Sequence, residues 1–396
     1  MSATEFHQSV PTSEIEQRIA SFQSLLAKAE IAAAVVVQSA DLYYLTGTTQ
    51  NAHLVVPSAG EPVMLVRRTL ERAQAESPVR RVEQLSSLSE LAGVLAAAGL
   101  GDGRLGFELD VLPAARYLDY VRRLPNHQIV DCSDLIRSIR AVKSPWELER
   151  IREAAGMISG VDERMREVFR LGMSEVELAA EIEFWLRSMG HQGQLRMRAF
   201  NGDLHYGTIT AGPAGALPGG TDTPLVGAGL NAYIGKGASA SSIDSGMPIV
   251  IDLIGSSEGY IADQTRCFSA GSLPQRMVAA YERSVEIGAE VSAAARPGVL
   301  GSALYELALK IADDLAPAMA TGTRVSFVAH GIGLELDEPP FFARGWDRPL
   351  EVGMVFALEP KFVFPGEGAL GLENSYVVTA DGAEKLTSAP EELIAL

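Results

Sequence analysis

The chain has few cysteines, a deficit of positive charge and no long hydrophobic run. Its two cysteines, Cys132 and Cys267, are too few for a disulfide framework and do not have the spacing of a zinc site. Lysine and arginine total 33 against 50 acidic residues, and the net charge of −17 argues against nucleic acid or an anionic membrane as a partner. Because neither a membrane-spanning run nor a signal peptide is visible, we expect a cytoplasmic protein with no membrane partner.

What the chain does have is enough apolar sequence for two cores, since hydrophobic residues make up 47% of its 396 residues. Alternating helical and strand-like segments before about residue 141 predict an α/β domain. Ser144, Pro145 and Glu147 then combine an N-cap, a proline at the first helical position and a capping-box glutamate. We therefore expect an N-terminal domain over residues 1–143 and a second domain over residues 144–396.

Apolar periodicity and capping signals predict further elements. Residues 12–30 have helical periodicity and are followed by a strand over residues 32–37. Ser174 opens a second capping box. Two more helices are expected over about residues 273–295 and 302–318.

Four acids and one histidine stand out in the second domain, most of them within apolar, strand-like runs. Burying an ionised carboxylate without compensation costs at least several kcal/mol, so such acids need arginines, protons or metal ions nearby. For one acid alone a salt-bridged structural role is the better interpretation, but five such residues together favour a metal site. Carboxylates with one imidazole suit divalent Mn, Fe, Co or Zn. The predicted ligands are Asp252, Asp263, His330, Glu359 and Glu373.

The order and spacing of these residues resemble those of the metal ligands in the prolidase, aminopeptidase P and methionine aminopeptidase superfamily, whose pita-bread fold is also that of creatinase. Residues 252–266 are similar to the segment that carries the first two ligands, which here are 11 residues apart. His330-Gly-Ile-Gly333 is similar to the His-Gly-x-Gly motif, and Glu359 and Glu373 have the family's separation of 14 residues. The similarity is strong from about residue 145 onward and weak before it.

This resemblance implies a fold, a cofactor and an assembly. The fold class would be α/β (α+β), with a creatinase-like N-terminal α/β domain followed by a pita-bread catalytic domain, closest to Xaa-Pro dipeptidase-like proteins. The cofactor would be two divalent ions of Mn, Co, Fe or Zn. Asp252 would bind one ion, Asp263 and Glu373 would bridge both, and His330 and Glu359 would complete the second. Many relatives are homodimers, so a homodimer is expected by analogy.

The resemblance also implies catalytic roles. The two ions would lower the pKa of a bridging water. Glu359 and His330 would be the catalytic residues, and Glu359 would carry a proton to the leaving nitrogen. Thr265 and Arg266 would orient the carboxylates; the alternative for Arg266 is a surface arginine paired with a nearby acid.

Two positions depart from the family pattern, both on the substrate side. Asp337 stands where the pattern His-Gly-x-Gly-x-x-x-His-Glu has its second histidine, and Gly219 replaces the histidine of an Ala-Leu-Pro-His-Gly segment. Asp337 would attract a cationic group such as a free amine. His205, which precedes a strand expected over residues 206–210, would take over part of the lost role. Both are candidate substrate-binding residues, with an ordinary loop acid and a structural histidine as the alternatives.

A glycine-rich loop over residues 213–247 is similar to an insertion between the replaced histidine and the first ligand. Long loops of this kind in compact domains are often lids or binding loops. A pocket-forming segment and a flexible surface excursion are equally compatible with its composition.

The sequence therefore predicts a metal-dependent hydrolase of amide bonds, similar to an Xaa-Pro dipeptidase or aminopeptidase, whose substrate is a dipeptide or another small molecule. The alternative is a non-peptidase hydrolase or lyase that cleaves a C–N bond of a small zwitterionic or cationic metabolite. Asp337 and the inserted loop favour this alternative. A non-catalytic binding protein ranks last, because all five ligand positions are retained.

Overall fold

The computed structural model describes residues 8–202, 204–220, 223–321 and 324–396. The chain divides into two compact units, Met1–Arg140 and Ala141–Leu396, and the division predicted from the sequence lies a few residues further on. Each unit buries hydrophobic residues of its own.

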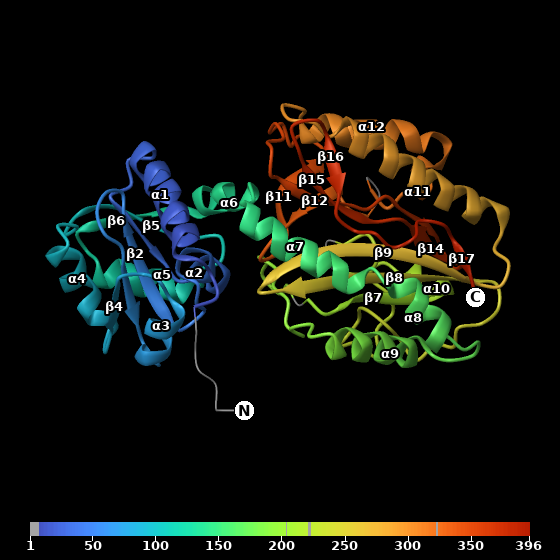
Figure 1. Ribbon diagram of the computed structural model, residues 1–396, viewed down its shortest axis with the longest axis horizontal. Helices are drawn as coiled ribbons and strands as arrows, with labels where there is room; N and C mark the ends of the chain where they lie inside the picture. Colours follow the sequence, from blue (N-terminus) through green and yellow to red (C-terminus); the bar gives the residue numbers. More distant parts are fainter. Residues whose placement is uncertain (1–7, 203, 221–222, 322–323) are drawn as a thin grey trace. The chain divides into compact units, whose positions relative to one another are not determined.

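Unit 1 is a six-stranded sheet of order β4-β3-β2-β1-β5-β6 with helices on both faces (Figure 1). β1 pairs antiparallel with β2 and parallel with β5. Every residue of β1 is buried, because alternate side chains point to opposite faces and both faces are covered. The strands are β1 (Ala33–Val36), β2 (Ala52–Pro57), β3 (Val63–Val66), β4 (Arg81–Gln84), β5 (Gly103–Phe107) and β6 (His127–Asp131). The helices are α1 (Thr12–Lys28), α2 (Ser39–Thr46), α3 (Leu70–Glu76), η1 (Leu88–Glu90), α4 (Leu91–Ala97), α5 (Ala114–Arg123) and α6 (Ser133–Ala141), which ends at the division.

Unit 2 contains two larger sheets and a two-stranded ribbon. The four-stranded sheet has the order β17-β9-β8-β7, the five-stranded sheet has the order β11-β10-β12-β15-β16, and the ribbon pairs β13 with β14. The strands of the four-stranded sheet are β7 (Gly207–Ala211), β8 (Met247–Ser257), β9 (Tyr260–Ala270) and β17 (Ile394–Ala395). The others are β10 (Phe327–Ile332), β11 (Leu336–Ala343), β12 (Val355–Leu358), β13 (Lys361–Phe364), β14 (Gly368–Gly371), β15 (Asn374–Val378) and β16 (Ala383–Lys385).

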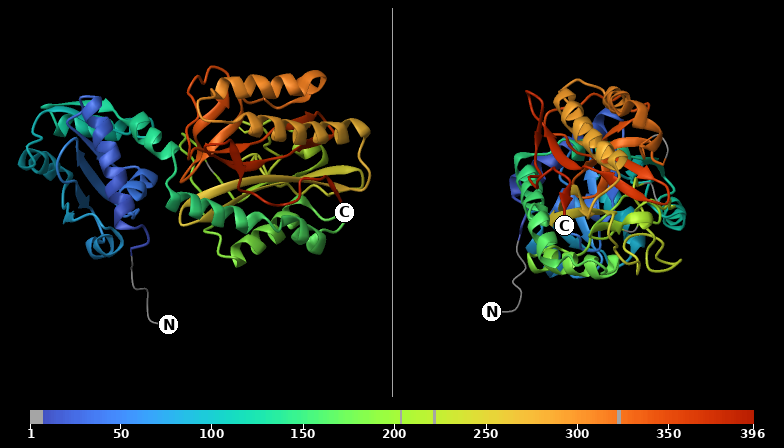
Figure 2. Two further views of the ribbon diagram at one scale, coloured as in Figure 1. Left: turned by 45° about the horizontal axis from the view of Figure 1, so that its top comes forward. Right: turned by 90° about the vertical axis from the view of Figure 1, so that its right-hand side faces the viewer.

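Helices cover the outer sides of unit 2, and the two sheets contact each other between them. Helices α11 and α12 lie against the five-stranded sheet and the ribbon, whereas α7 and α9 lie against β7, β8 and β9 (Figures 1 and 2). No helix in the described ranges is both long and apolar enough to span a membrane. The helices are α7 (Pro145–Ile158), α8 (Val161–Val168), α9 (Glu175–Ser188), α10 (Gly212–Gly215), α11 (Gln275–Ala294), α12 (Gly301–Ala312) and η2 (Asp313–Ala318).

The helix starts predicted from capping residues are confirmed. Ser144 and Ser174 each form a capping box, at the beginning of α7 and of α9. The helices predicted over residues 12–30 and 273–295 are α1 and α11. The helix predicted over residues 302–318 is α12 up to Ala312 and a 3₁₀ helix beyond it.

The predicted glycine-rich loop is fixed to the core of unit 2. The buried Glu175 carboxylate accepts hydrogen bonds from the main-chain N–H of Ala211 at 2.6 Å and of Ser239 at 2.8 Å. Between these anchors Tyr233 is 94% exposed. The loop is thus joined to β7 and α9 at its base and open to solvent at its tip. Residues 221–222 of the loop lie outside the described ranges.

Candidate metal centre

The first two predicted ligands lie on the long hairpin of β8 and β9. In its antiparallel register Asp252 lies opposite Thr265, and Asp263 lies opposite Ile254. Because side chains alternate between the two faces of a strand, all four side chains point to the same face. The separation of 11 residues between the two acids is the length that folds the strand back and brings the carboxylates together.

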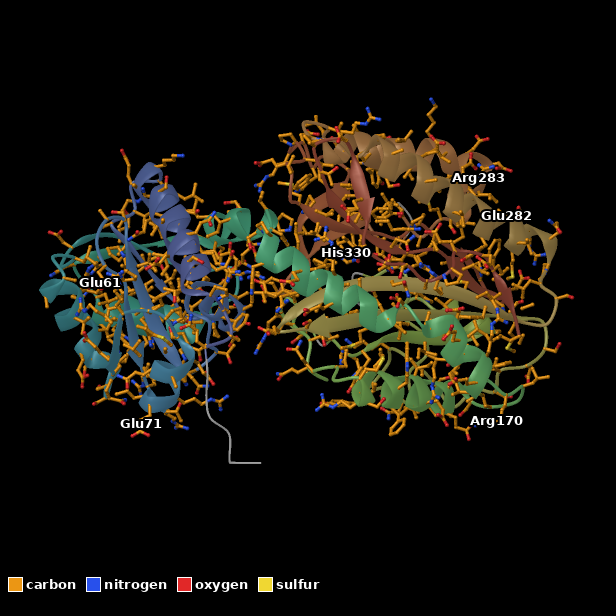
Figure 3. The ribbon with its side chains drawn as sticks, in the orientation of Figure 1. Glu61, Glu71, Arg170, Glu282, Arg283 and His330 are labelled. Atoms are coloured by element: carbon orange, nitrogen blue, oxygen red, sulfur yellow. The ribbon has the colours of Figure 1, made fainter. Side chains whose placement is uncertain are left out.

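The other three predicted ligands come from the five-stranded sheet. His330 is on β10, Glu359 directly follows β12, and Glu373 directly precedes β15. Strands β10 and β15 both pair with β12, and β9 of the other sheet contacts all three. The site therefore lies in the interior of unit 2, where Figure 3 shows His330 beside β9.

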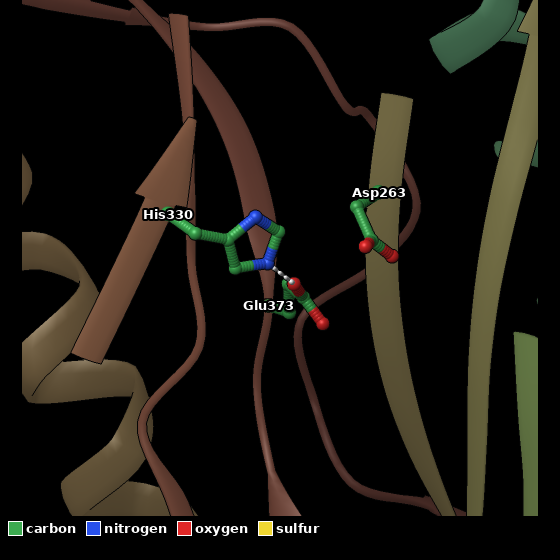
Figure 4. Close-up of side chains that lie close together, drawn as sticks. All are labelled: Asp263, His330 and Glu373. Atoms are coloured by element: carbon green, nitrogen blue, oxygen red, sulfur yellow. Dashed lines mark ion pairs between the residues drawn. The ribbon is translucent and has the colours of Figure 1, made fainter. Parts of the chain in front are cut away.

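Asp263, His330 and Glu373 form a buried group that could hold a metal ion. One ligand atom from each residue lies within 4.8 Å of the others, and the three side chains converge in Figure 4. Among the described residues, no donor reaches Asp263 Oδ1 or Glu373 Oε1, although both atoms are buried. Buried acceptors without a partner are rare in native proteins. A divalent cation would satisfy both oxygens, and two carboxylates with one imidazole suit Mn, Fe, Co or Zn.

Lys361, which the sequence reasoning missed, connects the remaining predicted ligands. Its side chain is fully buried, and its Nζ lies 3.0 Å from Glu359 Oε2, 3.0 Å from Glu373 Oε2 and 3.4 Å from Asp252 Oδ2. Part of the positive charge that these carboxylates require is therefore supplied by the chain itself.

A signal for this lysine was present in the sequence. Lys361 follows Glu359 by two residues in an apolar, strand-like run, and residues two apart in a strand share a face. A lysine placed between acids of this kind is a candidate ion-pair partner and not a surface residue.

Thr265 and Arg266 both contact Glu373. The Thr265 hydroxyl donates a hydrogen bond to Glu373 Oε2 at 2.6 Å. Arg266 is 1% exposed, and its guanidinium donates to the Glu373 carbonyl at 2.8 Å, to Asn374 Oδ1 at 2.8 Å and to the Ala389 carbonyl at 2.8 Å. The alternative of a surface arginine is therefore wrong. Arg266 fixes the main chain that carries Glu373, and Thr265 fixes its carboxylate.

Asp337 lies on the side of His330 that faces away from the carboxylates. Its Oδ1 is 3.6 Å from His330 Nδ1, whereas His330 Nε2 is 3.5 Å from Glu359 Oε1. A cavity of about 330 Å³ opens beside Asp337. It is lined by Ser326, Phe327, Asp337, Phe341, Ala343, Arg344, Gly345 and Trp346. The cavity adjoins the site and combines one acid, Asp337, and one arginine, Arg344, with three aromatic rings.

His205 has a different environment. Its side chain is 62% exposed, and its Nε2 lies 3.1 Å from Glu183 Oε1 on α9. The hydrogen bond to this carboxylate raises the pKa of His205. These contacts match a structural histidine, and the substrate-binding role of His205 stays a prediction.

Burial and mutual repulsion change the acidity of the ligands. Burial, together with the nearby Glu373 carboxylate, raises the pKa of Asp263 well above its ordinary value. Burial also raises the pKa of Glu359 to about 8, although Lys361 opposes this shift. For Glu373 burial acts in the same direction, but Lys361 and His330 outweigh it and lower the pKa. Lys361 and His330 thus keep Glu373 anionic, whereas Glu359 holds a proton near neutral pH when no cation is bound.

These shifts predict tighter metal binding at higher pH. A metal ion would displace the proton on Glu359, so the apparent Kd for Mn²⁺ should fall by up to about tenfold per pH unit below about pH 8, and the raised pKa of Asp263 acts in the same direction. Calorimetry in buffers of different ionisation enthalpy would count the released protons. An affinity that is flat or weaker with rising pH would contradict this prediction.

Comparison with known proteins assigns the chain to a family. The profile of metallopeptidase family M24 matches residues 149–380, more than half of the chain. The chain belongs to this family. The profile of the creatinase/prolidase N-terminal domain matches residues 18–142. The predicted class of enzyme, a metallopeptidase with a creatinase-like N-terminal domain and a pita-bread catalytic domain, is therefore confirmed.

Individual relatives agree with this assignment. Over 388 residues the chain is 28% identical to the probable dipeptidase PepE of Mycobacterium bovis, and the alignment covers 96% of each protein. It is 30% identical to the Xaa-Pro dipeptidase of Lactobacillus delbrueckii subsp. lactis over 66% of this M24 chain and 64% of that protein. The solved structure of an Xaa-Pro dipeptidase from Bacillus anthracis superposes with a TM-score of 0.83 at 24% identity, covering 96% of this chain and 100% of that one, which shows the shared fold.

Proposed function

We propose that this M24 protein hydrolyses the amide bond of Xaa-Pro dipeptides or of N-terminal Xaa-Pro segments with a metal-activated water. The observation that carries the proposal is the pair of buried carboxylate oxygens, Asp263 Oδ1 and Glu373 Oε1, that no donor reaches within the described chain. Similarity to proteins named Xaa-Pro dipeptidase supports the choice of substrate.

The residues of the site would have different roles in such a reaction. Asp263, His330 and Glu373 would hold a divalent ion, which when bound polarises the carbonyl and lowers the pKa of water. Glu359, whose pKa burial raises to about 8, is suited to accept a proton from the water and return it to the leaving nitrogen. Thr265 keeps the Glu373 carboxylate in place.

The finer predictions from the sequence belong to this proposal. They are a homodimer, a cytoplasmic location and a metal drawn from Mn, Co, Fe and Zn; of the two ions that the sequence predicts, we propose one. Asp263, His330 and Glu373 fit one of these ions. The surroundings of Asp252 do not fit the other, because Lys361 already occupies them.

The test is hydrolysis of a panel of Xaa-Pro dipeptides by protein loaded with Mn²⁺ or Co²⁺. We expect turnover that disappears after chelation and returns when the ion is restored. Dipeptides with alanine in place of proline are the control for specificity. Protein that retains metal but cleaves no member of the panel would overturn the dipeptidase function.

The second candidate function, cleavage of a C–N bond in a small cationic or zwitterionic metabolite, is favoured by the cavity beside Asp337. A carboxylate next to Phe327, Phe341 and Trp346 suits a cationic group, because aromatic faces and a carboxylate both attract positive charge. Arg344 in the same lining suits an anionic group, so the cavity favours a zwitterion over a simple cation. In a dipeptide the same cavity would accept the free amine.

Replacement of Asp337 by asparagine tests the role of the cavity. If Asp337 binds a cationic group of the substrate, KM should rise about tenfold while kcat and the metal content stay nearly unchanged. Ser326→Ala, in the same lining, is the matched control. A loss of bound metal with KM unchanged would instead assign Asp337 to the orientation of His330.

A further inference from the structure

The ammonium of Lys361 lies among the predicted metal ligands, in the position where one of the two predicted metal ions would otherwise bind. Its Nζ lies at ion-pair distance from three of the four predicted carboxylate ligands, with separations of 3.0, 3.0 and 3.4 Å. The lysine side chain is fully buried, so the ammonium has no solvent to compensate its charge. Within the described part of the chain, the carboxylates of Asp252, Glu359 and Glu373 stabilise it.

The main chain directs Lys361 into this place. The pairs Leu358 with Asn374 and Lys361 with Gly371 belong to one continuous register, and Glu359 and Glu373 meet between them. Lys361 therefore points to the same face as Glu359. A Cβ on Gly371 would collide with the Pro360 carbonyl and with the Lys361 side chain, so the glycine leaves the space in which the lysine lies.

The oxygens of the site separate into two groups. Lys361 contacts Oε2 of Glu359, Oε2 of Glu373 and Oδ2 of Asp252. The other oxygens of the two glutamates face His330 Nε2, at 3.5 and 3.8 Å. Glu373 Oε1 and Asp263 Oδ1 are the oxygens that no described donor reaches. One side of the site is thus neutralised by the chain, whereas the other side still requires a cation.

A second divalent ion does not fit on the lysine side. An ion bound to Asp252 and Glu373 would lie about 2.0–2.2 Å from their oxygens. Because Nζ is already 3.0–3.4 Å from the same oxygens, the ion and the ammonium would compete for them and repel each other as like charges. The net charge of the site also argues against a second ion. Four carboxylates balance two divalent ions, but with Lys361 present one ion already leaves only a single negative charge.

We propose that the ammonium of Lys361 replaces the metal ion on the Asp252 side, so that each chain binds one divalent ion, between Asp263, His330 and Glu373. This inference rests on the metal site of the proposed function. Asp252 is then a partner of Lys361 and not a ligand, and Glu359 is shared between the lysine and the ion.

The number of bound ions tests this proposal without reference to substrate. Chelator-treated protein is titrated with Mn²⁺, bound metal per chain is measured by plasma mass spectrometry, and electron paramagnetic resonance separates isolated from magnetically coupled Mn²⁺. We expect one ion per chain with the spectrum of isolated Mn²⁺. Two ions per chain, a coupled pair, or no retained ion would each overturn the proposal.

Removal of the lysine gives the complementary test. Lys361→Ala frees the space and the oxygens on the Asp252 side, so we expect two ions per chain and a coupled spectrum. Lys385→Ala removes an exposed lysine of the same unit, which pairs with Glu391, and should leave one ion. A folded Lys361→Ala protein that still binds one ion would show that Lys361 does not exclude the second. If this variant fails to fold, the titration of the wild type still shows whether each chain binds one ion or two.

The two proposals fail separately. Wild-type protein that binds one ion but cleaves no Xaa-Pro dipeptide would remove the dipeptidase function and leave this inference intact. Protein that binds two ions and cleaves Xaa-Pro dipeptides would contradict this inference and support the dipeptidase function.

Discussion

Asp263→Asn should abolish metal retention and reduce kcat/KM for the preferred substrate on the order of 10³-fold. Asp263 is 4% exposed, and its Oδ1 is one of the two buried oxygens that no described donor reaches. An amide is a poor ligand for a hard divalent ion and brings no charge. Bound metal after dialysis and steady-state kinetics would measure both effects.

The same substitution should not unfold the protein. The Asp263 carboxylate is buried and faces other carboxylates, as its raised pKa records, so the neutral amide relieves repulsion in the metal-free state. We expect a metal-free Tm equal to or above that of the wild type. Asp244→Asn, at an exposed acid of the same unit, is the control. Full activity in Asp263→Asn would show that the reaction does not use this site.

Arg266→Met should lower the stability of the protein by about 3–5 kcal/mol, which corresponds to a fall in Tm of roughly 10 °C. The guanidinium donates hydrogen bonds to the carbonyls of Thr265, Glu373 and Ala389 and to the side chain of Asn374. A methionine fills part of the volume but removes the donor of the buried Glu373 and Ala389 carbonyls, whereas Asn374 Oδ1 keeps the Thr387 hydroxyl and the Thr265 carbonyl keeps the Glu373 N–H. Differential scanning calorimetry would measure the change.

Arg266→Lys should rescue little of this loss, because an ammonium on a flexible stem cannot reproduce the planar set of donors. Arg152→Met, which removes an arginine that is 48% exposed and paired with Glu384, should change the stability by less than about 1 kcal/mol. An Arg266→Met protein as stable as the wild type would show that the buried guanidinium is not needed to hold the chain at Glu373.

The sequence predicted the parts of this fold that depend on local rules. The capping boxes at Ser144 and Ser174 determine where α7 and α9 begin, and both are local hydrogen-bond patterns. The predicted ligands came from charged residues set in apolar runs and from their resemblance in order and spacing to a family pattern. Of these five residues, the structure brings Asp263, His330 and Glu373 together as a group that could hold an ion.

The parts that the sequence did not predict depend on contacts between distant segments. The burial of Arg266 follows from acceptors near residues 373 and 389, which the local sequence does not specify. Lys361 was missed because a lysine in a strand is usually exposed, and only the meeting of Asp252, Glu359 and Glu373 shows that this one is buried. The cavity beside Asp337 required the positions of aromatic side chains on two segments.

The central claim is that one divalent ion at Asp263, His330 and Glu373 is responsible for hydrolysis. The most direct test follows bound Mn²⁺ and cleavage of alanylproline in the same samples of chelator-treated protein during one titration. The account predicts that the rate rises in proportion to bound metal and levels off at one equivalent per chain. Hydrolysis that proceeds without metal, or that begins only when a second ion binds, would contradict it.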